Sequence, residues 1–150
     1  MASTVTAATL TVTVQESITL NNLERGSKNV LTVANINEVD NRVMSIPSAS
    51  EVTVVSLGTA VAGGQYIRSD VKYVRITNLD ATNFVRVRVA DTGGVTADFK
   101  IEAGKSFMLG NGNLSAHATE GAFSSFADID SIKARADSLP VDVEIFIASV

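Results

Sequence analysis

The chain has 150 residues, enough for one domain with a sizeable core, and it has no cysteine, which excludes disulfides and thiolate metal sites. Its formal net charge of −4 works against binding to the phosphate backbone of nucleic acids. Hydrophobic residues make up 45% of the chain but aromatic residues only 5%, and the apolar residues are mostly Val, Ile, Leu and Ala, a mixture typical of strands and turns.

The N-terminal stretch MASTVTAATLTVTV alternates apolar and small polar residues, which predicts a strand at 9–14. It lacks the basic region and solid apolar core of a signal peptide. No run of about 18 apolar residues occurs, so we expect neither an export signal nor a transmembrane helix.

Residues 1–37 are predicted to form an N-terminal arm or edge strands. A second strand is expected at 29–35, and Asn21 and Asn22 mark a turn between the two strands. Large aliphatic side chains are sparse here, and fixing the backbone of each residue costs about 1–2 kcal/mol. We therefore expect this segment to dominate the contact with a partner, for example by adding a strand to a neighbouring sheet.

Residues 38–150 show dense apolar–polar alternation, interrupted by turn residues about every 8–12 positions. Together with the arm, this pattern predicts an all-β fold, an antiparallel β-sandwich of the jelly-roll or Ig-like type with an extended N-terminal segment. The strands of the sandwich are expected at 42–46, 52–57, 71–77, 84–89, 97–102, 105–109, 131–136 and 141–147.

The stretch 122–132 departs from this pattern, because Phe123, Phe126, Ile129 and Ile132 recur at a spacing of three. Such a spacing fits a short helix or an ordered loop that tucks its phenylalanines under the sheet. We expect the loop.

The stretch VRITNLDATNFVRVRV, residues 74–89, is predicted to form a hairpin around a loop at 78–83. Alternation places the valines and Ile76 on the inner face. The outer face then carries Arg75, Arg86 and Arg88.

These outward arginines have two interpretations, a groove for nucleic acid or a sheet face covered with opposite charges. A nucleic-acid groove needs exposed aromatic side chains, and Tyr73 is the only outward aromatic nearby. We therefore favour ion pairs and expect no nucleic acid and no membrane among the partners. The expected pairs set Lys133 and Arg135 opposite Asp142 and Glu144 in a C-terminal hairpin.

The core is predicted from the inward positions of the strands. Buried side chains are expected at Val74, Ile76, Val85, Val87, Phe99, Ile101, Phe107, Leu109, Val143 and Ile145.

Candidate catalytic and ligand-binding residues are few. His117 is the only histidine, no nucleophile elbow accompanies it, and one histidine without cysteine is a poor zinc ligand set. Gly104, Lys105 and Ser106 resemble the end of a phosphate-binding loop, but position 99 is Phe instead of the required Gly, so we expect a hairpin turn.

Asp128, Asp130 and Asp137 have a spacing found in calcium loops but lack the central Gly and final Glu of an EF-hand. The sequon at Asn113 has no secretory signal beside it. We therefore predict no catalytic, cofactor or metal site, no cofactor, and a protein that is not an enzyme.

Two parts of the sequence resemble a known class of protein. One is EVDNRVMSIP followed by EVTVVSLG; the other comprises VKYVRITNLD, FKIEAGKSFML and VDVEIFI. Together, over about residues 38–150, they resemble small virion structural proteins of tailed bacteriophages, especially those of marine and cyanobacterial hosts. The resemblance implies a β-rich protein located in the virion, and it offers no functional residues.

The function expected from this resemblance is capsid decoration, or cement, that stabilises the head through protein–protein contacts. The expected partners are the major capsid protein or other virion proteins, and a homo-oligomer such as a trimer at a capsid symmetry axis. A neck, tail or fibre-base component is the alternative within the virion. A carbohydrate-binding β-sandwich is the alternative from another class, although the chain offers only Tyr66 and Tyr73, and no Trp, for an aromatic platform.

Overall fold

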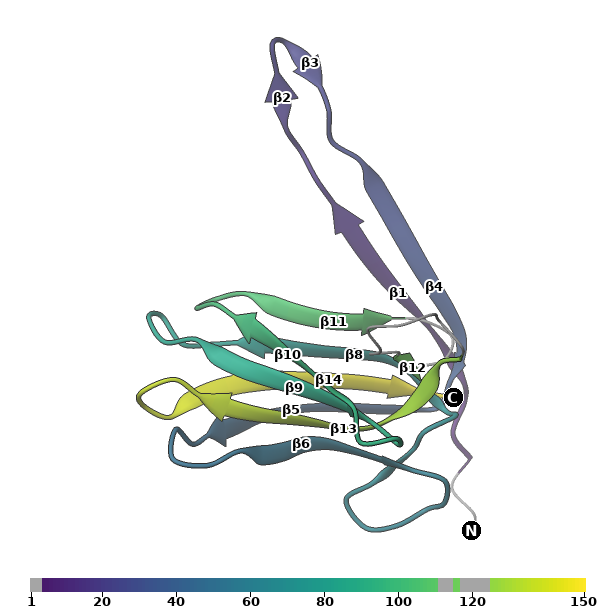
Figure 1. Cartoon of the computed structure of the whole chain (residues 1–150). Coiled ribbons are helices and arrows are strands. Elements are labelled where there is room, and N and C mark those ends of the chain that lie inside the picture. The colour runs from purple at the N-terminus through teal and green to yellow at the C-terminus, as the bar shows by residue number, and fades with distance from the viewer. Residues whose placement is uncertain (1–3, 111–114, 117–124) are drawn as a thin grey trace.

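The computed structural model describes residues 4–110, 115–116 and 125–150, and every regular element in these ranges is a strand. Two sheets pack face to face as a β-sandwich, from one end of which a long hairpin projects (Figure 1). The all-β sandwich prediction is confirmed. The strands are β1 (Ala8–Gln15), β2 (Thr19–Leu20), β3 (Leu23–Glu24), β4 (Lys28–Ile36), β5 (Glu38–Ile46), β6 (Val52–Gly58), β7 (Tyr66–Ile67), β8 (Val71–Asn78), β9 (Val85–Asp91), β10 (Thr96–Ile101), β11 (Ser106–Gly110), β12 (Ser115–Ala116), β13 (Ala127–Ala136) and β14 (Val141–Ser149).

The strand order is that of a jelly roll. One sheet has the order β11-β8-β14-β5, and the other has the order β10-β9-β13-β6, with the short β7 parallel to β6 and β12 paired to β13. Antiparallel pairing is nested, because β5 pairs with β14, β6 with β13, β8 with β11 and β9 with β10. A long hairpin rolled up across two sheets gives this pattern.

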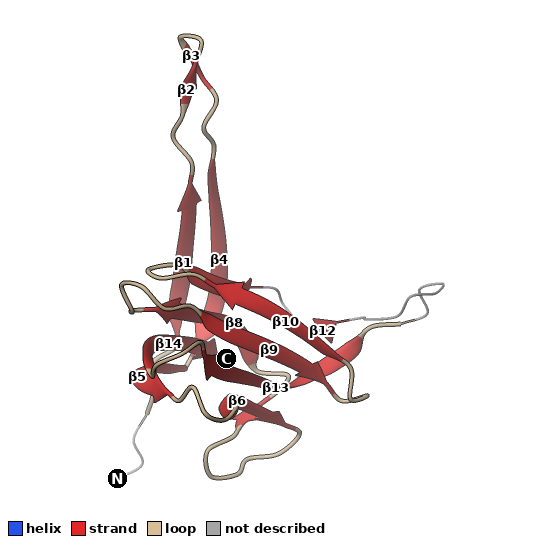
Figure 2. Cartoon of the chain, turned by 60° about the vertical axis from the view of Figure 1, so that its left-hand side comes forward, coloured by secondary structure: helices blue, strands red, loops and turns tan. Residues whose placement is uncertain are grey.

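Three hairpins expected from the sequence are instead connections between the two sheets. β8 leads to β9, β10 to β11 and β13 to β14, and each time the chain crosses from one sheet to the other (Figure 1; Figure 2 shows β8, β9, β13 and β14 from a second side). Alternation fixes which side chains face inward, but it does not distinguish a neighbour in the same sheet from a partner across the core. The turn at Gly104, with φ of 68°, is one of these crossings.

The predicted core is largely confirmed. Buried side chains are Val74, Ile76, Val85, Val87, Ile101, Val143 and Ile145, while Phe107 and Leu109 are half-buried against them. The prediction that Phe99 is buried is wrong, because its side chain is 43% exposed. It lies on the edge strand β10, where its ring stacks on that of Phe107 at 4.9 Å between centroids and closes the side of the sandwich.

The prediction of a loop at 122–132 is also wrong for its second half, because these residues form the start of β13. Ile129 and Ile132 are both buried although they are three positions apart, a spacing that would put them on opposite faces of a regular strand. A register irregularity between Ile129 and Ser131 explains the spacing, because a bulge inserts an extra residue and returns the next apolar side chain to the core. Phe126 is 63% exposed and does not tuck under the sheet. Phe123 lies outside the described residues.

Candidate interaction surface: the N-terminal arm

The residues considered for chemistry are dispersed. Lys105 and Ser106 follow a turn between the sheets, and Asp130 forms an ion pair of 3.0 Å with Arg68. His117 and Asn113 lie outside the described residues. In the part of the chain that the structure describes, no three His, Asp or Glu side chains are grouped as metal ligands.

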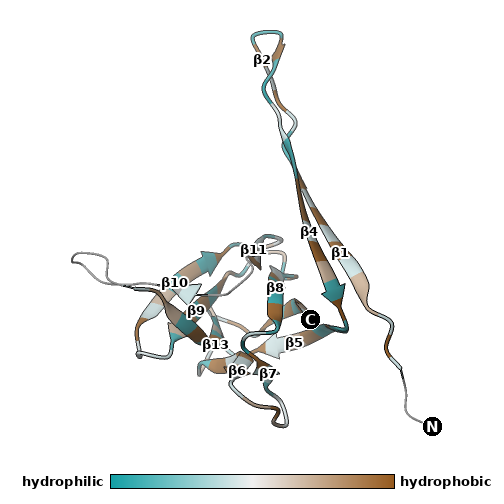
Figure 3. Cartoon of the chain, turned by 90° about the vertical axis from the view of Figure 1, so that its right-hand side faces the viewer, coloured by the Kyte–Doolittle hydropathy of each residue, from teal (hydrophilic) through white to brown (hydrophobic). Residues whose placement is uncertain are grey.

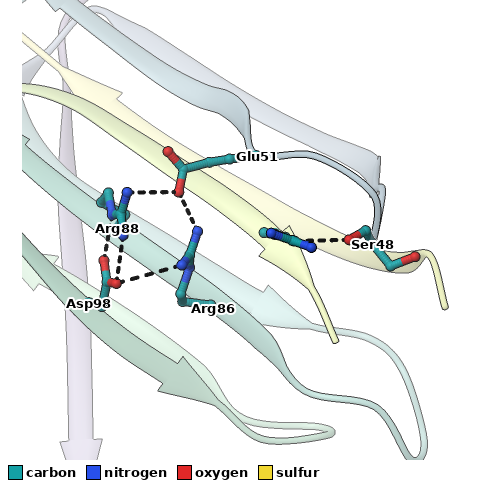
Figure 4. A network of polar contacts seen from close by, with 6 residues as sticks. Ser48, Glu51, Arg86, Arg88 and Asp98 are labelled. Atoms are coloured by element: carbon teal, nitrogen blue, oxygen red, sulfur yellow. Dashed lines mark hydrogen bonds and ion pairs between the residues drawn. The ribbon is translucent and has the colours of Figure 1, made fainter. Parts of the chain in front are cut away.

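The outward arginines of β9 are paired with carboxylates. Arg88 donates to both carboxylate oxygens of Asp98, at 2.7 and 2.9 Å, and Arg86 contacts Glu51 at 2.5 Å (Figure 4). Glu51, directly before β6, also lies 3.4 Å from Arg88, so the four side chains form one network that reaches from β10 across β9 to the start of β6. The hydrogen bonds from Arg88 hold the pKa of Asp98 below its ordinary value.

The predicted partners of the C-terminal charges are wrong. Lys133 and Arg135 lie on β13, whereas Asp142 and Glu144 lie on β14 in the opposite sheet. Arg135 instead donates to the carbonyl of Ser48 at 2.9 Å. The charge that does meet Glu144 is Arg75 of β8, at 3.0 Å on the outer face of the β11-β8-β14-β5 sheet.

The most distinctive surface is the arm, the hairpin of β1 and β4 that leaves the sandwich on the outer side of that same sheet (Figure 3). Pairing sets Leu10 opposite Val33 and Val12 opposite Leu31. Because side chains alternate along a strand, these four lie on one face of the ribbon and the threonines lie on the other. The arm therefore has an apolar face and a polar face.

The base of the arm is fixed to the sandwich by a small second core. Tyr73 and Ala148 face outward from the main sheet and are buried together with Ile36 under the arm, against Leu31 and Phe146. The rings of Tyr73 and Phe146 meet edge to face at 6.0 Å. Burial raises the pKa of Tyr73. The arm is thus anchored at its base by its own sandwich.

Gly110 allows this close seating. A Cβ at this position would lie 3.1 Å from Leu31 Cδ2 and 3.1 Å from Tyr73 Cδ2, tighter than ordinary packing contacts.

Beyond this anchored base, the arm and the sheet diverge and leave an open groove of about 540 Å³ between them. We call it the arm groove. Its apolar walls are Val12 and Val14 of the arm, and Tyr73, Met108 and Phe146 of the sheet. Arg75 also lines it, with its charge taken up by Glu144.

The far end of the arm, residues 16–27, is called the arm tip. Asn21 and Asn22 both have positive φ, 51° and 62°, and join Leu20 to its partner Leu23 as a two-residue turn with type I′ geometry. The expected turn at these asparagines is confirmed.

The arm tip is held by Glu24. Its carboxylate accepts hydrogen bonds from the backbone N–H of Gly26 at 2.8 Å and of Ile18 at 3.2 Å. These bonds lower the pKa of Glu24. Ser27 also donates to Glu16 at 2.8 Å. Both carboxylates of the tip are therefore hydrogen-bonded within the tip itself.

The large apolar side chains of the tip, in contrast, are exposed to solvent. Ile18, Leu20 and Leu23 are 55%, 58% and 55% exposed. Leu20 lies opposite Leu23, and Ile18 is two residues from Leu20, so the three side chains share one face. Three large aliphatic groups exposed together on an ordered tip are typical of a contact surface.

The sequence predicted the arm but not the side chains that anchor its base to the sandwich. Tyr73 was expected as an exposed aromatic residue and is 5% exposed, because the arm covers it. Phe146, Met108 and Gly110 were missed. The available signal was an aromatic pair at outward positions of β8 and β14, which a solvated sheet face does not need.

Among the described residues, there is no helix able to span a membrane. Comparison of the chain with models of protein families, with curated proteins and with solved structures found no match.

Proposed function

We propose that this protein is a non-enzymatic structural component of a virus particle, a decoration or cement protein of a bacteriophage head that acts by binding neighbouring subunits. The observation that carries the proposal is the arm. It presents three exposed aliphatic side chains, Ile18, Leu20 and Leu23, on a tip closed by backbone hydrogen bonds. The outward arginines of β9 are already paired with carboxylates. A preorganised apolar projection favours binding because little ordering cost remains.

The virion itself is proposed from the resemblance of residues 38–150 to phage structural proteins. The jelly roll adds a fold-level analogy, since viral capsid domains and lectins both use it. A neck, tail or fibre-base position remains the alternative within the particle. The carbohydrate-binding alternative has weaker support, because Tyr73 is buried and Tyr66 is half-buried, with its hydroxyl directed to Asp40.

The test is incorporation into particles. Particles purified by density gradient from a lysate that contains the protein should carry it, as detected by mass spectrometry. Recovery only in the unassembled fractions would overturn the proposal. A glycan array with the isolated protein tests the carbohydrate alternative.

A shortened variant separates the arm from the rest. Deleting residues 1–20 would remove β1 and leave β4 unpaired, so we replace 16–27 by Asn-Gly, which keeps Gln15 opposite Lys28 across a two-residue turn. We expect this variant to melt like the parent chain and to stay out of particles. The control is Val61→Ser, an 85% exposed position elsewhere. Incorporation of the shortened variant would exclude the arm as the contact.

A further inference from the structure

We propose that the outer face of the β10-β9-β13-β6 sheet binds a carboxylate-rich surface of another protein. Its centre is a group of five basic side chains, which we call the basic face: Arg86, Arg88, Lys100, Lys133 and Arg135. The chain has 12 Lys and Arg residues against 16 Asp and Glu, so this gathering of cations runs against its composition. The inference concerns this face alone and does not rest on the function proposed above.

Strand pairing places these cations directly beside one another. Between β13 and β9, Lys133 lies opposite Arg88 and Arg135 lies opposite Arg86. Between β10 and β9, Lys100 lies opposite Arg86 from the other side. Opposed residues of an antiparallel pair have Cβ atoms about 4.5–5.5 Å apart, so like charges there destabilise the sheet. Side chains that break such a local rule are typical of functional surfaces.

The carboxylates of the chain itself neutralise only part of the basic face. Glu51 and Asp98 contact the two arginines of β9 (Figure 4). Glu102 contacts Lys100 at 2.6 Å. Three carboxylates thus meet five cations, which leaves a surplus of two positive charges on this face.

The surplus lies on β13. Among the residues that the structure describes, no carboxylate forms an ion pair with Lys133 or Arg135. Arg135 donates to a backbone carbonyl at 2.9 Å, a group without a charge to offset the guanidinium. Of the nearby acidic residues, Asp130 is paired with Arg68 at 3.0 Å, and Asp137 follows the end of the strand. Both cations are therefore available to an outside carboxylate.

The existing ion pairs show which group this face accepts. The carboxylate of Glu51 lies between two cations, 2.5 Å from Arg86 and 3.4 Å from Arg88. Asp98 likewise lies 2.7 Å from Arg88 and 3.8 Å from Arg86. A partner carboxylate between Lys133 and Arg88 would repeat this arrangement one strand further on. It would form charge-assisted hydrogen bonds and replace a repulsion by an attraction.

Carboxylates of a protein fit this face better than the phosphates of a nucleic acid. Duplex DNA carries one charge per about 1.7 Å of its axis, so its phosphates would also meet Glu51 and Asp98. A protein surface can instead place single carboxylates opposite single cations. Stacking of bases needs exposed aromatic rings. Phe84, the ring nearest to this face, is half-buried and has the ammonium of Lys100 above it at 4.3 Å.

The basic face and the arm lie on opposite sides of the sandwich (Figure 3). The arm is anchored on the outer side of the β11-β8-β14-β5 sheet, whereas the basic face belongs to the other sheet. A partner bound to the basic face therefore leaves the arm accessible, and one molecule can contact two neighbours at once.

The first experiment supplies the missing carboxylate from within the chain. Lys133→Glu sets a carboxylate opposite Arg88, and the matched control Lys28→Glu makes the same charge change at an exposed position of the arm. Lys133→Glu should raise the melting temperature by about 1–4 °C, because an opposed pair of like charges becomes an ion pair. Lys28→Glu should not raise it. A melting temperature that falls in Lys133→Glu would show that Lys133 stabilises the fold, and would overturn the proposal.

The second experiment measures binding of a fluorescein-labelled oligoglutamate peptide to the full chain by fluorescence anisotropy, with a labelled DNA duplex as the other probe. The parent chain should bind the peptide, and more weakly as salt is added. Lys133→Glu combined with Arg135→Gln should weaken that binding by at least roughly tenfold, while Lys28→Glu should not change it. No binding by the parent chain, binding unchanged in the double variant, or tighter binding to the duplex than to the peptide would each overturn the proposal.

Discussion

Asn78 and Ile101 belong to opposite sheets of the sandwich, and the side-chain Nδ2 of Asn78 donates to the backbone carbonyl of Ile101 at 3.1 Å. The same nitrogen donates to the carbonyl of Asn83 at 2.9 Å, and Oδ1 accepts the N–H of Asp80 at 2.9 Å. Asn78 is fully buried. One amide therefore fixes both the crossing from β8 to β9 and the end of β10.

Replacing Asn78 by Ala should destabilise the fold by about 2–4 kcal/mol, because two carbonyls and one N–H lose their partner in or near the core. Asn78→Asp should be worse still, since it directs a carboxylate at two carbonyl oxygens. Urea unfolding measures both. The control is Asn83→Ala, whose side chain accepts a hydrogen bond from the exposed hydroxyl of Ser138 at 3.2 Å and lies beside Asp80, and which should lose less than about 1 kcal/mol. Equal losses at both positions would contradict the bridging role.

The core is expected to discriminate sharply between Ile145 and Phe99. Ile145→Ala should cost about 2–5 kcal/mol, because the side chain is fully buried and leaves a cavity. Phe99→Ala removes a larger side chain but should cost less, since that side chain is 43% exposed at the sandwich edge. Denaturant titration ranks the two variants, and the opposite order would mean that the Phe99–Phe107 stack carries more of the core than its exposure indicates.

The bidentate pair of Arg88 and Asp98 should show a small but measurable coupling. Their side chains are 31% and 40% exposed, so screening by water keeps the coupling well below that of a buried pair. A double-mutant cycle with Arg88→Ala and Asp98→Ala measures it. Arg88→Lys should recover only part, because an ammonium group cannot match both oxygens at once. Full recovery by Lys would argue that only charge matters.

Acid should weaken the fold below about pH 4. The pKa values of Glu24, Asp80 and Asp98 are lowered from ordinary values of 4.5, 3.8 and 3.8 by hydrogen bonds to backbone N–H groups or to Arg88. A lowered pKa means that the unfolded chain binds protons more readily. The associated stability is therefore complete above the ordinary values and is lost as the pH falls through the folded ones.

Melting temperature measured from pH 7 to pH 2 tests this dependence. Asp80→Asn and Asp98→Asn should each flatten the acid limb of the curve. Asp142→Asn, at an exposed position on the other sheet, should leave its slope unchanged. A slope unaffected by the first two substitutions would rule out these carboxylates as its source.

Gly26 should be essential for the arm tip and irrelevant to the sandwich. A Cβ there would lie 2.1 Å from the carbonyl oxygen of Glu16, so Gly26→Ala must distort the tip. Limited proteolysis with trypsin at Arg25 should become faster, while thermal melting of the sandwich should not change. Gly63→Ala is the control, because nothing lies within 4 Å of its added Cβ. Unchanged cleavage in the Gly26 variant would mean that the tip is not rigid in the parent chain.

The sequence predicted the strands and their inward faces well, because alternation is a local property of each segment. Ile76 and Val87 were placed correctly for that reason. Which strands lie side by side is a non-local property. Arg75 pairs with Glu144, and not with an acidic residue near Arg86, because β8 and β9 belong to different sheets. Nothing within residues 74–89 encodes that choice.

The arm was predicted in outline, because sparse aliphatic residues beside an asparagine turn indicate a ribbon without a core of its own. The contact between the base of the arm and the sheet was not predicted. In VDVEIFIAS, Phe146 belongs to a nearly continuous apolar run, so its outward direction becomes informative only when β4 is known to cover it. The groove likewise depends on the angle at which the arm leaves the sheet, and that angle is not visible in the pattern of the arm residues alone.

The nested pairing of the jelly roll sets the order in which parts of the chain can mature. The hairpin of β1 and β4 closes between residues near in sequence, an event that takes about 1–10 μs in isolated hairpins. β5 must wait for β14, whose residues 141–149 emerge from the ribosome about 100 positions later at about 5–20 residues per second. For several seconds of synthesis the arm can exist while the sheet that seats it is incomplete. Nascent chains on one messenger could therefore present arms before their sandwiches close.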